Sequence, residues 1–163
     1  MITAKRARDV LAYDPISGAL TWKVALSNRT RVGQDAGSPR KDGRVCVSVD
    51  GRRYRKARVC WLIYYGRWPN GEVDHRDCNP SNDSIDNLRE ATGSQNGANK
   101  RMWKRNKTGV NGVHWAKCNN MWVAEVFVGG KRVFQKYFHS FDEAKTAREA
   151  AFERAYGEFA RHG

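Results

Sequence analysis

The chain has 163 residues, and its 30 Lys and Arg against 17 Asp and Glu give a formal charge of +13. A hydrophobic fraction of 40% with six Trp supplies enough material for a folded core, which excludes a wholly disordered chain. No apolar run approaches the roughly 18 residues that cross a bilayer, and the first residues lack the apolar stretch of a secretory signal. The charge predicts a polyanionic partner, with nucleic acid ahead of an acidic membrane surface.

The cysteines indicate the redox setting. Cys46, Cys60, Cys78 and Cys118 are scattered and show no CxxC spacing, so we expect neither a structural zinc site nor a disulfide framework. A reduced cytoplasmic location is the simplest expectation.

The positive charge is divided unevenly along the chain. The net charge is +10 over residues 1–70, −4 over residues 71–99 and +7 over residues 100–163. An acidic segment between two basic ones would repel phosphate, unless it holds a divalent cation that faces the phosphate. A solvated loop whose acidic groups balance the surface is the alternative.

The first quarter of the chain predicts short elements. Residues 3–13 read as a basic helix with Thr3 as its N-cap, and residues 14–18 have turn chemistry. A strand is predicted over 20–24, and residues 33–43 are rich in Gly, Ser, Pro and Asp, which is typical of a loop.

A basic hairpin and an apolar helix follow. Strands are predicted over 45–49 and 52–56, joined by a tight turn at Asp50-Gly51, and residues 57–65 predict a buried helix that Gly66 closes. The return strand suits phosphate contacts, and its basic side chains are candidates for DNA binding or, alternatively, a solvated surface: Arg52, Arg53, Arg55 and Lys56.

The acidic segment holds the candidate catalytic residues. Asp74 and His75 end a predicted strand, and Asn87 opens the strand that returns after a polar loop. Thr92 to Gln95 then fits a capping box, and the helix it starts carries Asn96 and Asn99 one turn apart.

These residue types suit phosphodiester hydrolysis. A neutral imidazole with a pKa near ~6.5 can take a proton from an attacking water, which is the role open to His75. Asp74 and the carbonyl of Asn96 offer hard oxygen ligands for a divalent cation, and Asn87 can fix the loop and the His75 tautomer through a hydrogen bond. A lone Asp-His pair is usually only a polar part of the surface, and asparagines in helices are often caps or face solvent. The ordered combination of these residues is much more specific.

The last third predicts a second module. Residues 100–110 read as a helix end and linker, and three strands over 110–138 turn at Asn119-Asn120 and Gly129-Gly130. A helix is expected over 141–156, with a stripe of alanines that lets it lie close to the sheet. Strand parity places on the apolar face Val113, Trp115, Trp122, Ala124, Val126, Val128, Val133 and Tyr137. The other face then holds His114, Ala116, Glu125, Phe127, Arg132, Phe134 and Lys136.

Two segments of the chain resemble known protein families. The segment VDHRDCNPSNDSIDNLREATGSQNGANK resembles the HNH nuclease motif of phage homing or free-standing endonucleases, in the form in which asparagine replaces the later histidines. The segment from GVNGVHWAK to YGEFARHG resembles an AP2 DNA-binding domain. The resemblance implies that His75 is the general base, that Asn87 orients it, and that Asp74 and Asn96 hold one Mg²⁺ or Mn²⁺ ion.

The two resemblances imply an α+β fold with three parts. These are a basic hairpin region with a buried helix (1–70), an HNH ββα-metal module (71–104) and an AP2-like three-stranded antiparallel sheet packed on one helix (108–163). Beyond the basic hairpin, the candidate DNA-binding residues are Asn99, Lys100, Arg101, Lys104, Arg105, His114, Arg132, Phe134 and Lys136.

The leading hypothesis is a metal-dependent endonuclease that nicks duplex DNA, acts as a monomer or pairs on DNA, and has no membrane partner. A non-catalytic DNA-binding regulator on the same scaffold is the alternative. A third hypothesis, an RNA-binding or ribosome-associated basic protein, has only the charge in its favour.

Overall fold

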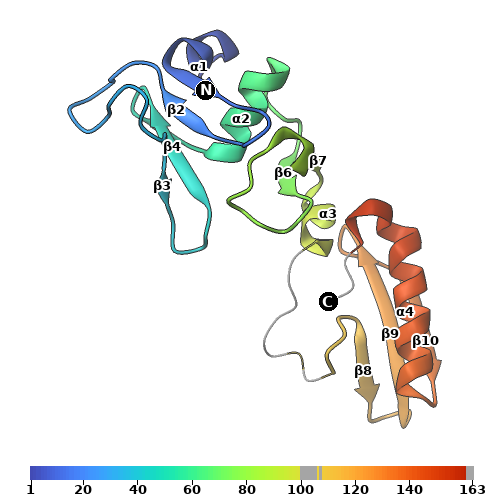
Figure 1. The fold of residues 1–163 in the computed structure, drawn as a ribbon. Helices are drawn as coiled ribbons and strands as arrows, with labels where there is room; N and C mark the ends of the chain where they lie inside the picture. The colour runs from blue at the N-terminus through green and yellow to red at the C-terminus, as the bar shows by residue number, and fades with distance from the viewer. Residues whose placement is uncertain (100–105, 107, 161–163) are drawn as a thin grey trace. The chain divides into compact units, whose positions relative to one another are not determined.

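A computed structural model describes residues 1–99, 106 and 108–160 of the chain (Figure 1). The described part is a mixed α/β fold of four α-helices and several small antiparallel sheets. It forms two compact units, Met1–Ala91 and Thr92–Gly163, which are described separately below. The predicted DNA contacts at Lys100, Arg101, Lys104 and Arg105 lie outside the described residues. Within the described ranges, no helix has the length and apolar character needed to span a bilayer.

The first unit opens with a helix that is shorter than predicted. Helix α1 (Ala4–Val10) begins at Thr3, whose hydroxyl accepts a hydrogen bond from the Arg6 amide. The prediction of helix as far as Tyr13 is wrong, because Leu11–Tyr13 forms strand β1 and pairs with β2 (Leu20–Trp22). The turn between these strands brings the paired residues Leu11 and Trp22 into the core.

The basic hairpin forms as predicted. Strands β4 (Val45–Val49) and β5 (Arg52–Arg55) pair around Asp50 and Gly51, and both turn residues have positive φ, as a tight hairpin turn requires. A two-residue strand, β3 (Ser38–Pro39), extends the sheet at β4.

The buried helix packs under this sheet. Helix α2 (Lys56–Tyr65) ends at Gly66, which adopts the left-handed conformation at the C-cap. Its buried face contributes Val59, Trp61 and Leu62 to one hydrophobic core, which also contains Val47 and Val49 of β4.

The ββ hairpin of the acidic segment completes the first unit. Strand β6 (Glu72–His75) pairs with β7 (Leu88–Ala91), and a 3-10 turn, η1 (Ile85–Asn87), leads into β7. Leu88 belongs to the core of this unit, and Val73 packs against it. The hairpin is thereby attached to the N-terminal elements.

The second unit begins with α3 (Gly93–Ala98), and its capping box forms as predicted. The Thr92 hydroxyl accepts from the Gln95 amide while the Gln95 side chain accepts from the Thr92 amide. Ala98 packs against a cluster that contains Val126 and Phe152.

The three predicted strands and the long helix form the rest of the unit. Strands β8 (Val113–Ala116), β9 (Met121–Val128) and β10 (Lys131–Phe138) make an antiparallel sheet in the order β10-β9-β8. Helix α4 (Phe141–Tyr156) starts at the Ser140 cap, packs on one face of this sheet and is followed by the short turn η2 (Gly157–Phe159).

A β-bulge changes which residues of β10 face the helix. The pairing of β10 with β9 shifts by one residue between Arg132 and Phe134. Phe134 therefore packs in the core beside α4, while Val133 and Tyr137 are exposed. The strand parity expected from the sequence is wrong here, because the extra residue in a bulge reverses the alternation beyond it.

The compact units do not follow the three parts predicted from the sequence. The β6–β7 hairpin shares its core with the N-terminal elements, whereas α3 packs against residues of the C-terminal sheet and helix. The predicted 71–104 module thus contributes to both units.

Candidate active site

The predicted metal ligand Asp74 is buried in the ββ hairpin. In the register of β6 and β7, Asp74 lies opposite Arg89, and the Arg89 Nε atom donates to Asp74 Oδ2 at 2.9 Å. Both side chains are buried. Arg89 therefore balances the charge of Asp74 and orients its carboxylate.

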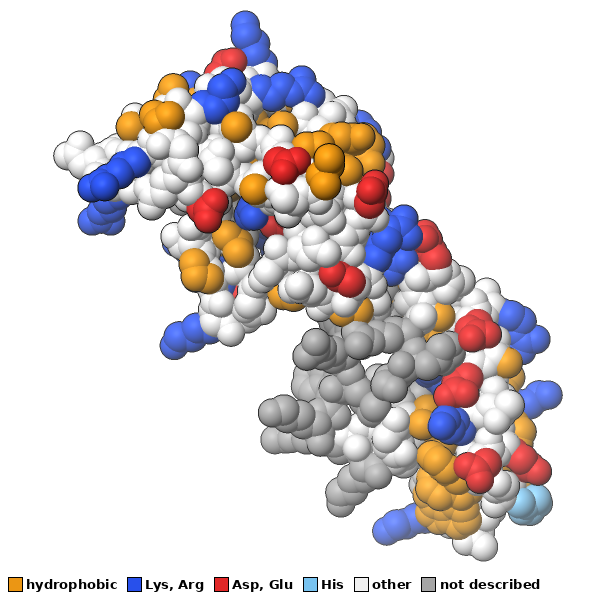
Figure 2. Space-filling model, viewed as in Figure 1, with side chains coloured by type: hydrophobic (Ala, Val, Ile, Leu, Met, Phe, Trp, Pro, Cys, Tyr) orange, Lys and Arg blue, Asp and Glu red, His pale blue; other side chains and the backbone are white. Residues whose placement is uncertain are grey.

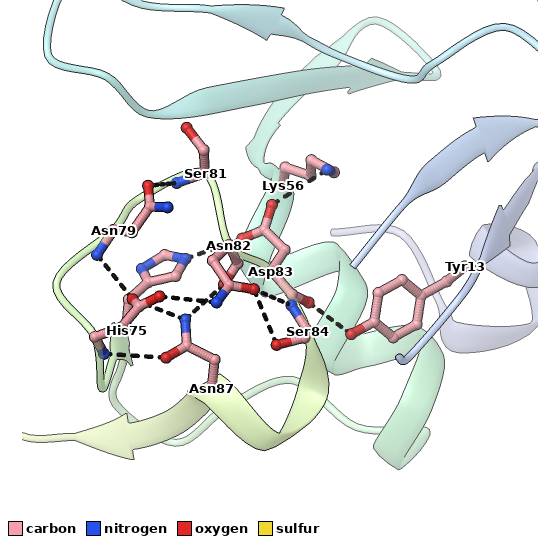
Figure 3. Close-up of polar contacts among 10 residues, drawn as sticks. Tyr13, Lys56, His75, Asn79, Ser81, Asn82, Asp83, Ser84 and Asn87 are labelled. Atoms are coloured by element: carbon pink, nitrogen blue, oxygen red, sulfur yellow. Dashed lines mark hydrogen bonds and ion pairs between the residues drawn. The ribbon is translucent and has the colours of Figure 1, made fainter. Parts of the chain in front are cut away.

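The predicted general base His75 is the last residue of β6, and its ring faces an acidic partner. The His75 Nε2 atom lies 2.9 Å from Oδ1 of Asp83, in the loop that follows the strand (Figure 3). Asp83 is 1% exposed, so water does not compete for this contact. Because a carboxylate accepts hydrogen bonds, Nε2 is the nitrogen that carries a proton here, and in a neutral ring Nδ1 is then the basic nitrogen.

Asp83 has a cationic neighbour on its other side. The Lys56 Nζ atom lies 3.4 Å from Asp83 Oδ2, at the start of α2 (Figure 3). This oxygen has no partner in hydrogen-bond geometry, so Lys56 stabilises it by charge. The Lys56 side chain is only 16% exposed. This ion pair argues against the DNA contact expected of Lys56, because its ammonium group already faces a buried carboxylate.

The N-terminal hairpin holds the backbone at Asp83. The Tyr13 hydroxyl donates to the Asp83 carbonyl at 2.7 Å, and burial raises the pKa of Tyr13, which keeps this donor protonated. Gly18 lies so close that an added Cβ would be 2.5 Å from the carbonyl carbon of Asp83. Ile85 in turn donates its amide to Pro15. The β1–β2 turn thus fixes the loop that carries the partner of His75.

The predicted loop residue Asn87 orders the chain that follows His75. Its side-chain oxygen accepts from the Asp77 amide, and its nitrogen donates to Asp77 Oδ1 and to the Asn82 carbonyl. Partial burial of Asp77 acts to raise its pKa, but the hydrogen bonds from Asn79, Asn82 and Asn87 together outweigh it and leave the pKa lowered.

The His75 ring is oriented by Asp83, and not by the direct hydrogen bond from Asn87 that was expected from the sequence. Among the described residues, the Asn87 amide bonds within the loop, and His75 Nε2 pairs with Asp83 instead. The physical reason is that the loop backbone uses the hydrogen-bonding groups of Asn87.

The two helix asparagines lie in α3, in the second compact unit. Asn96 occupies the helix interior, and its pairing with Asp74 as a metal ligand stays a prediction. Asn99 is the C-cap of α3 and is buried. Its burial argues against the DNA contact expected of Asn99.

The remaining basic residues of the β4–β5 hairpin are exposed. Arg52, Arg53 and Arg55 all reach the surface of the first unit. A groove of about 680 Å³ runs beside the hairpin, and Arg29 and Arg53 line it. Figure 2 shows Lys and Arg side chains spread over the visible face of both units. The exposed arginines of the hairpin are therefore placed where a phosphate backbone can reach them.

The outer face of the second unit carries a different set from the one predicted. His114 and Arg132 are exposed there, each within 4 Å of the Glu125 carboxylate. Phe134 packs beside α4 instead, which argues against the base contact expected of it. Lys136 lies opposite the core residue Ala124 in the pairing of β10 with β9. Its side chain is therefore on the face that α4 covers, and not on the outer face expected from the sequence.

Two exposed rings occupy the outer face. Phe127 pairs with Arg132, and Tyr137 takes the place expected for Phe134. The bulge at Val133 carries no clear sign in the sequence, which is why Tyr137 was not predicted.

The donor set expected for a metal is chemically suited to a hard divalent ion. Asp74 supplies a carboxylate that Arg89 already orients, and Asn96 supplies an amide oxygen. Across residues 1–99, 106 and 108–160, no group of three or more His, Cys, Asp or Glu side chains is arranged to hold a metal. Oxygen ligands of this kind suit a hard ion such as Mg²⁺ better than zinc.

Sequence reasoning missed Asp83 as the partner of His75. Asp83 lies eight residues after His75, in the same polar loop as Asp77. The spacing along the sequence does not show which of the two aspartates pairs with His75. Only the fold shows that Asp83 is enclosed by Lys56, Tyr13 and the ring of His75.

Comparison with known proteins gives one family match and one curated relative. Residues 54–98 match the family of HNH endonucleases, and the match spans Asp74, His75, Asn87 and Asn96. The chain is 40% identical over 73 residues to Protein 3.8 of Escherichia phage T7. That alignment covers 44% of this chain and 60% of the phage protein, which is less than two thirds of its length. No solved structure matches the chain.

Proposed function

We propose that the protein is a metal-dependent DNA endonuclease that hydrolyses phosphodiester bonds of duplex DNA. The observation that carries the proposal is the pairing of His75 Nε2 with buried Asp83, within a segment that matches HNH endonucleases. An imidazole held in one tautomer at the end of a strand suits general-base chemistry. The net charge of +13 and the exposed arginines of the β4–β5 hairpin support DNA as the substrate.

The proposed step uses His75 as the base. The Nδ1 atom takes a proton from a water molecule, and the oxygen of that water forms a bond to phosphorus. The bond from phosphorus to the 3′ oxygen breaks, and the departing oxygen takes up a proton from solvent. Asp83 holds the ring and balances the positive charge that His75 gains, while Lys56 holds Asp83.

We further propose that Asp74 and Asn96 hold one Mg²⁺ or Mn²⁺ ion, and that Asn87 acts by fixing the loop between His75 and Asp83. When bound, such an ion stabilises the charge that develops on the phosphate and on the leaving oxygen. The assignment of Asn96 rests on its sequence position and on the family match, which includes it. Arg89 keeps the Asp74 carboxylate in one orientation for this role.

The second unit is proposed to bind DNA as an AP2-like module. A three-stranded antiparallel sheet packed on one helix supports this proposal, as do the exposed Arg132 and His114 on the outer face. With one catalytic site per chain, we propose that the product is a nick.

Incubation of the full chain with supercoiled plasmid tests the proposed function. With Mg²⁺ or Mn²⁺ present, we expect conversion to open circles, and we expect EDTA to prevent it. Tight DNA binding without conversion under any divalent ion would instead identify a non-catalytic DNA-binding protein.

A further inference from the structure

Helix α4 places an arginine at a position normally taken by an apolar residue. Arg148 is 6% exposed and lies on the face of α4 that carries the buried residues Ala144, Ala151 and Phe152. Its guanidinium carbon is 3.9 Å from the centre of the Phe152 ring, a cation–π contact. The helix therefore buries a positive charge between itself and the sheet.

This charge forms no ion pair in the described structure, although the adjacent Glu149 carboxylate interacts with it electrostatically. The Nε atom is enclosed without a hydrogen-bond partner, and across the described residues no ion pair or hydrogen bond of the Arg148 side chain is found. Burial lowers the pKa of Arg148, but an arginine stays protonated in a protein. An enclosed cation without an ion pair is costly, and a stacked ring and the nearby Glu149 offset this cost only in part.

Arg148 lines a pocket of about 350 Å³ within the second unit. The pocket, called here the α4 pocket, is bounded by Ser94 and Asn111, by the Gly129-Gly130 turn, and by Phe152 and Tyr156. None of the described residues that line it is acidic, so Arg148 is its one charged group in the described part of the chain. The pocket therefore favours an anion.

The rim of the pocket is held by its own hydrogen bonds. The Tyr156 hydroxyl donates to the Phe127 carbonyl at 2.6 Å and lies 2.8 Å from Ser94 Oγ. Ser94 Oγ also accepts from the Gly129 amide. These bonds tie the start of α3 to the hairpin turn, so the pocket exists before any ligand arrives.

A second donor faces the same space. The Asn111 side-chain oxygen accepts from Asn106, so the Asn111 amide nitrogen is the atom left to donate. Gly129 and Gly130 both have positive φ and no side chain, and a Cβ added at either would meet nothing within 4 Å. A ligand can therefore approach the turn closely.

We propose that the α4 pocket binds a phosphate group, with Arg148 as its cationic donor. A planar guanidinium presents paired N–H groups that match two phosphate oxygens. Because no described carboxylate lines the pocket, these N–H groups are available to a phosphate. The net charge of +7 over residues 92–163 draws phosphate to this unit. The phosphate is either part of a DNA backbone or free inorganic phosphate, and the proposal does not depend on the cleavage reaction.

The test uses the full chain and two matched variants. Arg148→Met keeps the length of the buried stem and removes the charge, and Arg154→Met makes the same change at an exposed position of the same helix. Thermal unfolding is followed with inorganic phosphate against sodium chloride at equal ionic strength. We expect phosphate to raise the melting temperature of wild type and Arg154→Met saturably, and to leave Arg148→Met unchanged.

DNA binding to an uncleavable duplex at several salt concentrations identifies the source of the phosphate. If a backbone phosphate occupies the pocket, loss of Arg148 removes one phosphate contact. The plot of log affinity against log salt should then be less steep for Arg148→Met than for wild type, by about 0.9. For a purely surface contact, Arg154→Met would show the same or a larger decrease. A phosphate effect on melting with an unchanged slope identifies free phosphate as the ligand.

A wild-type measurement keeps the proposal testable if Arg148→Met does not fold. The Nε–H resonance of Arg148 should shift as inorganic phosphate is titrated into the native protein. If that resonance stays fixed, phosphate does not raise the melting temperature and the two variants have equal salt slopes, Arg148 is only a packing residue and the proposal is overturned.

Discussion

The Nε2 atom of His75 lies 2.9 Å from Oδ1 of Asp83, and Asp83 is almost completely enclosed. Lys56 contacts the other oxygen of the same carboxylate, and Tyr13 holds the backbone of Asp83. The first residue of α2 and a tyrosine of strand β1 are thus used to position the proposed base. The N-terminal region consequently supports the candidate active site in addition to offering exposed arginines.

Replacing Asp83 by Asn should reduce cleavage without a matching loss of DNA affinity. Asparagine keeps the shape but can present its amide to Nε2, which no longer selects the tautomer with a basic Nδ1. We expect kcat to fall at least about 10-fold, less than the roughly 10²–10⁴-fold typical for loss of a general base, with KM nearly constant. Asp86→Asn, an exposed change in the same segment, is the control. A fall in DNA affinity as large as the fall in kcat would contradict a positioning role.

The contact of Lys56 with Asp83 should be visible in stability. Lys56→Met leaves the buried carboxylate with His75 alone, so the free energy of unfolding should fall, though by less than the roughly 3–5 kcal/mol seen when a fully buried ion pair loses one partner. In a double-mutant cycle with Asp83→Asn, denaturant titrations should show that the two losses are not additive. Additive losses would show that Lys56 and Asp83 do not interact.

The bulge in β10 predicts opposite results for two phenylalanines. Phe134 packs against α4, so Phe134→Ala should lower the free energy of unfolding by up to about 3 kcal/mol. Phe127 is exposed on the outer face, so Phe127→Ala should change stability little and weaken DNA binding. Denaturant titration and fluorescence anisotropy measure the two effects. If Phe127→Ala lowered stability and Phe134→Ala weakened only DNA binding, the result would favour the strand parity expected from the sequence over the bulge.

Acid should weaken the hairpin that carries His75. The Glu90 carboxylate accepts two hydrogen bonds from Arg67 and one from the Asn70 amide, and these lower its pKa. A lowered folded-state pKa contributes stability above the ordinary value of about 4.3, and this contribution disappears as pH falls through the folded-state value. For an exposed pair, up to about 1 kcal/mol is expected. The difference in unfolding free energy between wild type and Glu90→Gln should therefore shrink as the pH falls below the ordinary glutamate value, and a difference independent of pH would refute it.

Local signals in the sequence predicted much of the fold. The capping box at Thr92 and Gln95, the left-handed cap at Gly66 and the Asp50-Gly51 turn all form in the structure. Each is specified by a few neighbouring residues, so no knowledge of the tertiary structure is needed to find it.

Features set by distant contacts were not predictable in the same way. Residues 11–13 have a helical pattern but pair with β2, because the turn after Tyr13 lets the buried Leu11 and Leu20 meet in one core. Lys56 looks like its exposed neighbours in the sequence, and only folding places its ammonium group beside Asp83. The residues with candidate chemistry were found from their types, whereas the partner of His75 required the fold.

The most direct test of the proposed endonuclease compares wild type with His75→Ala on supercoiled plasmid in Mg²⁺, with duplex affinity measured in parallel. We expect open-circle product from wild type and none from His75→Ala, while DNA affinity stays within a few fold, because a neutral imidazole contributes little to phosphate binding. Equal conversion by the two proteins would contradict the role of His75 as the base and the assignment that rests on it.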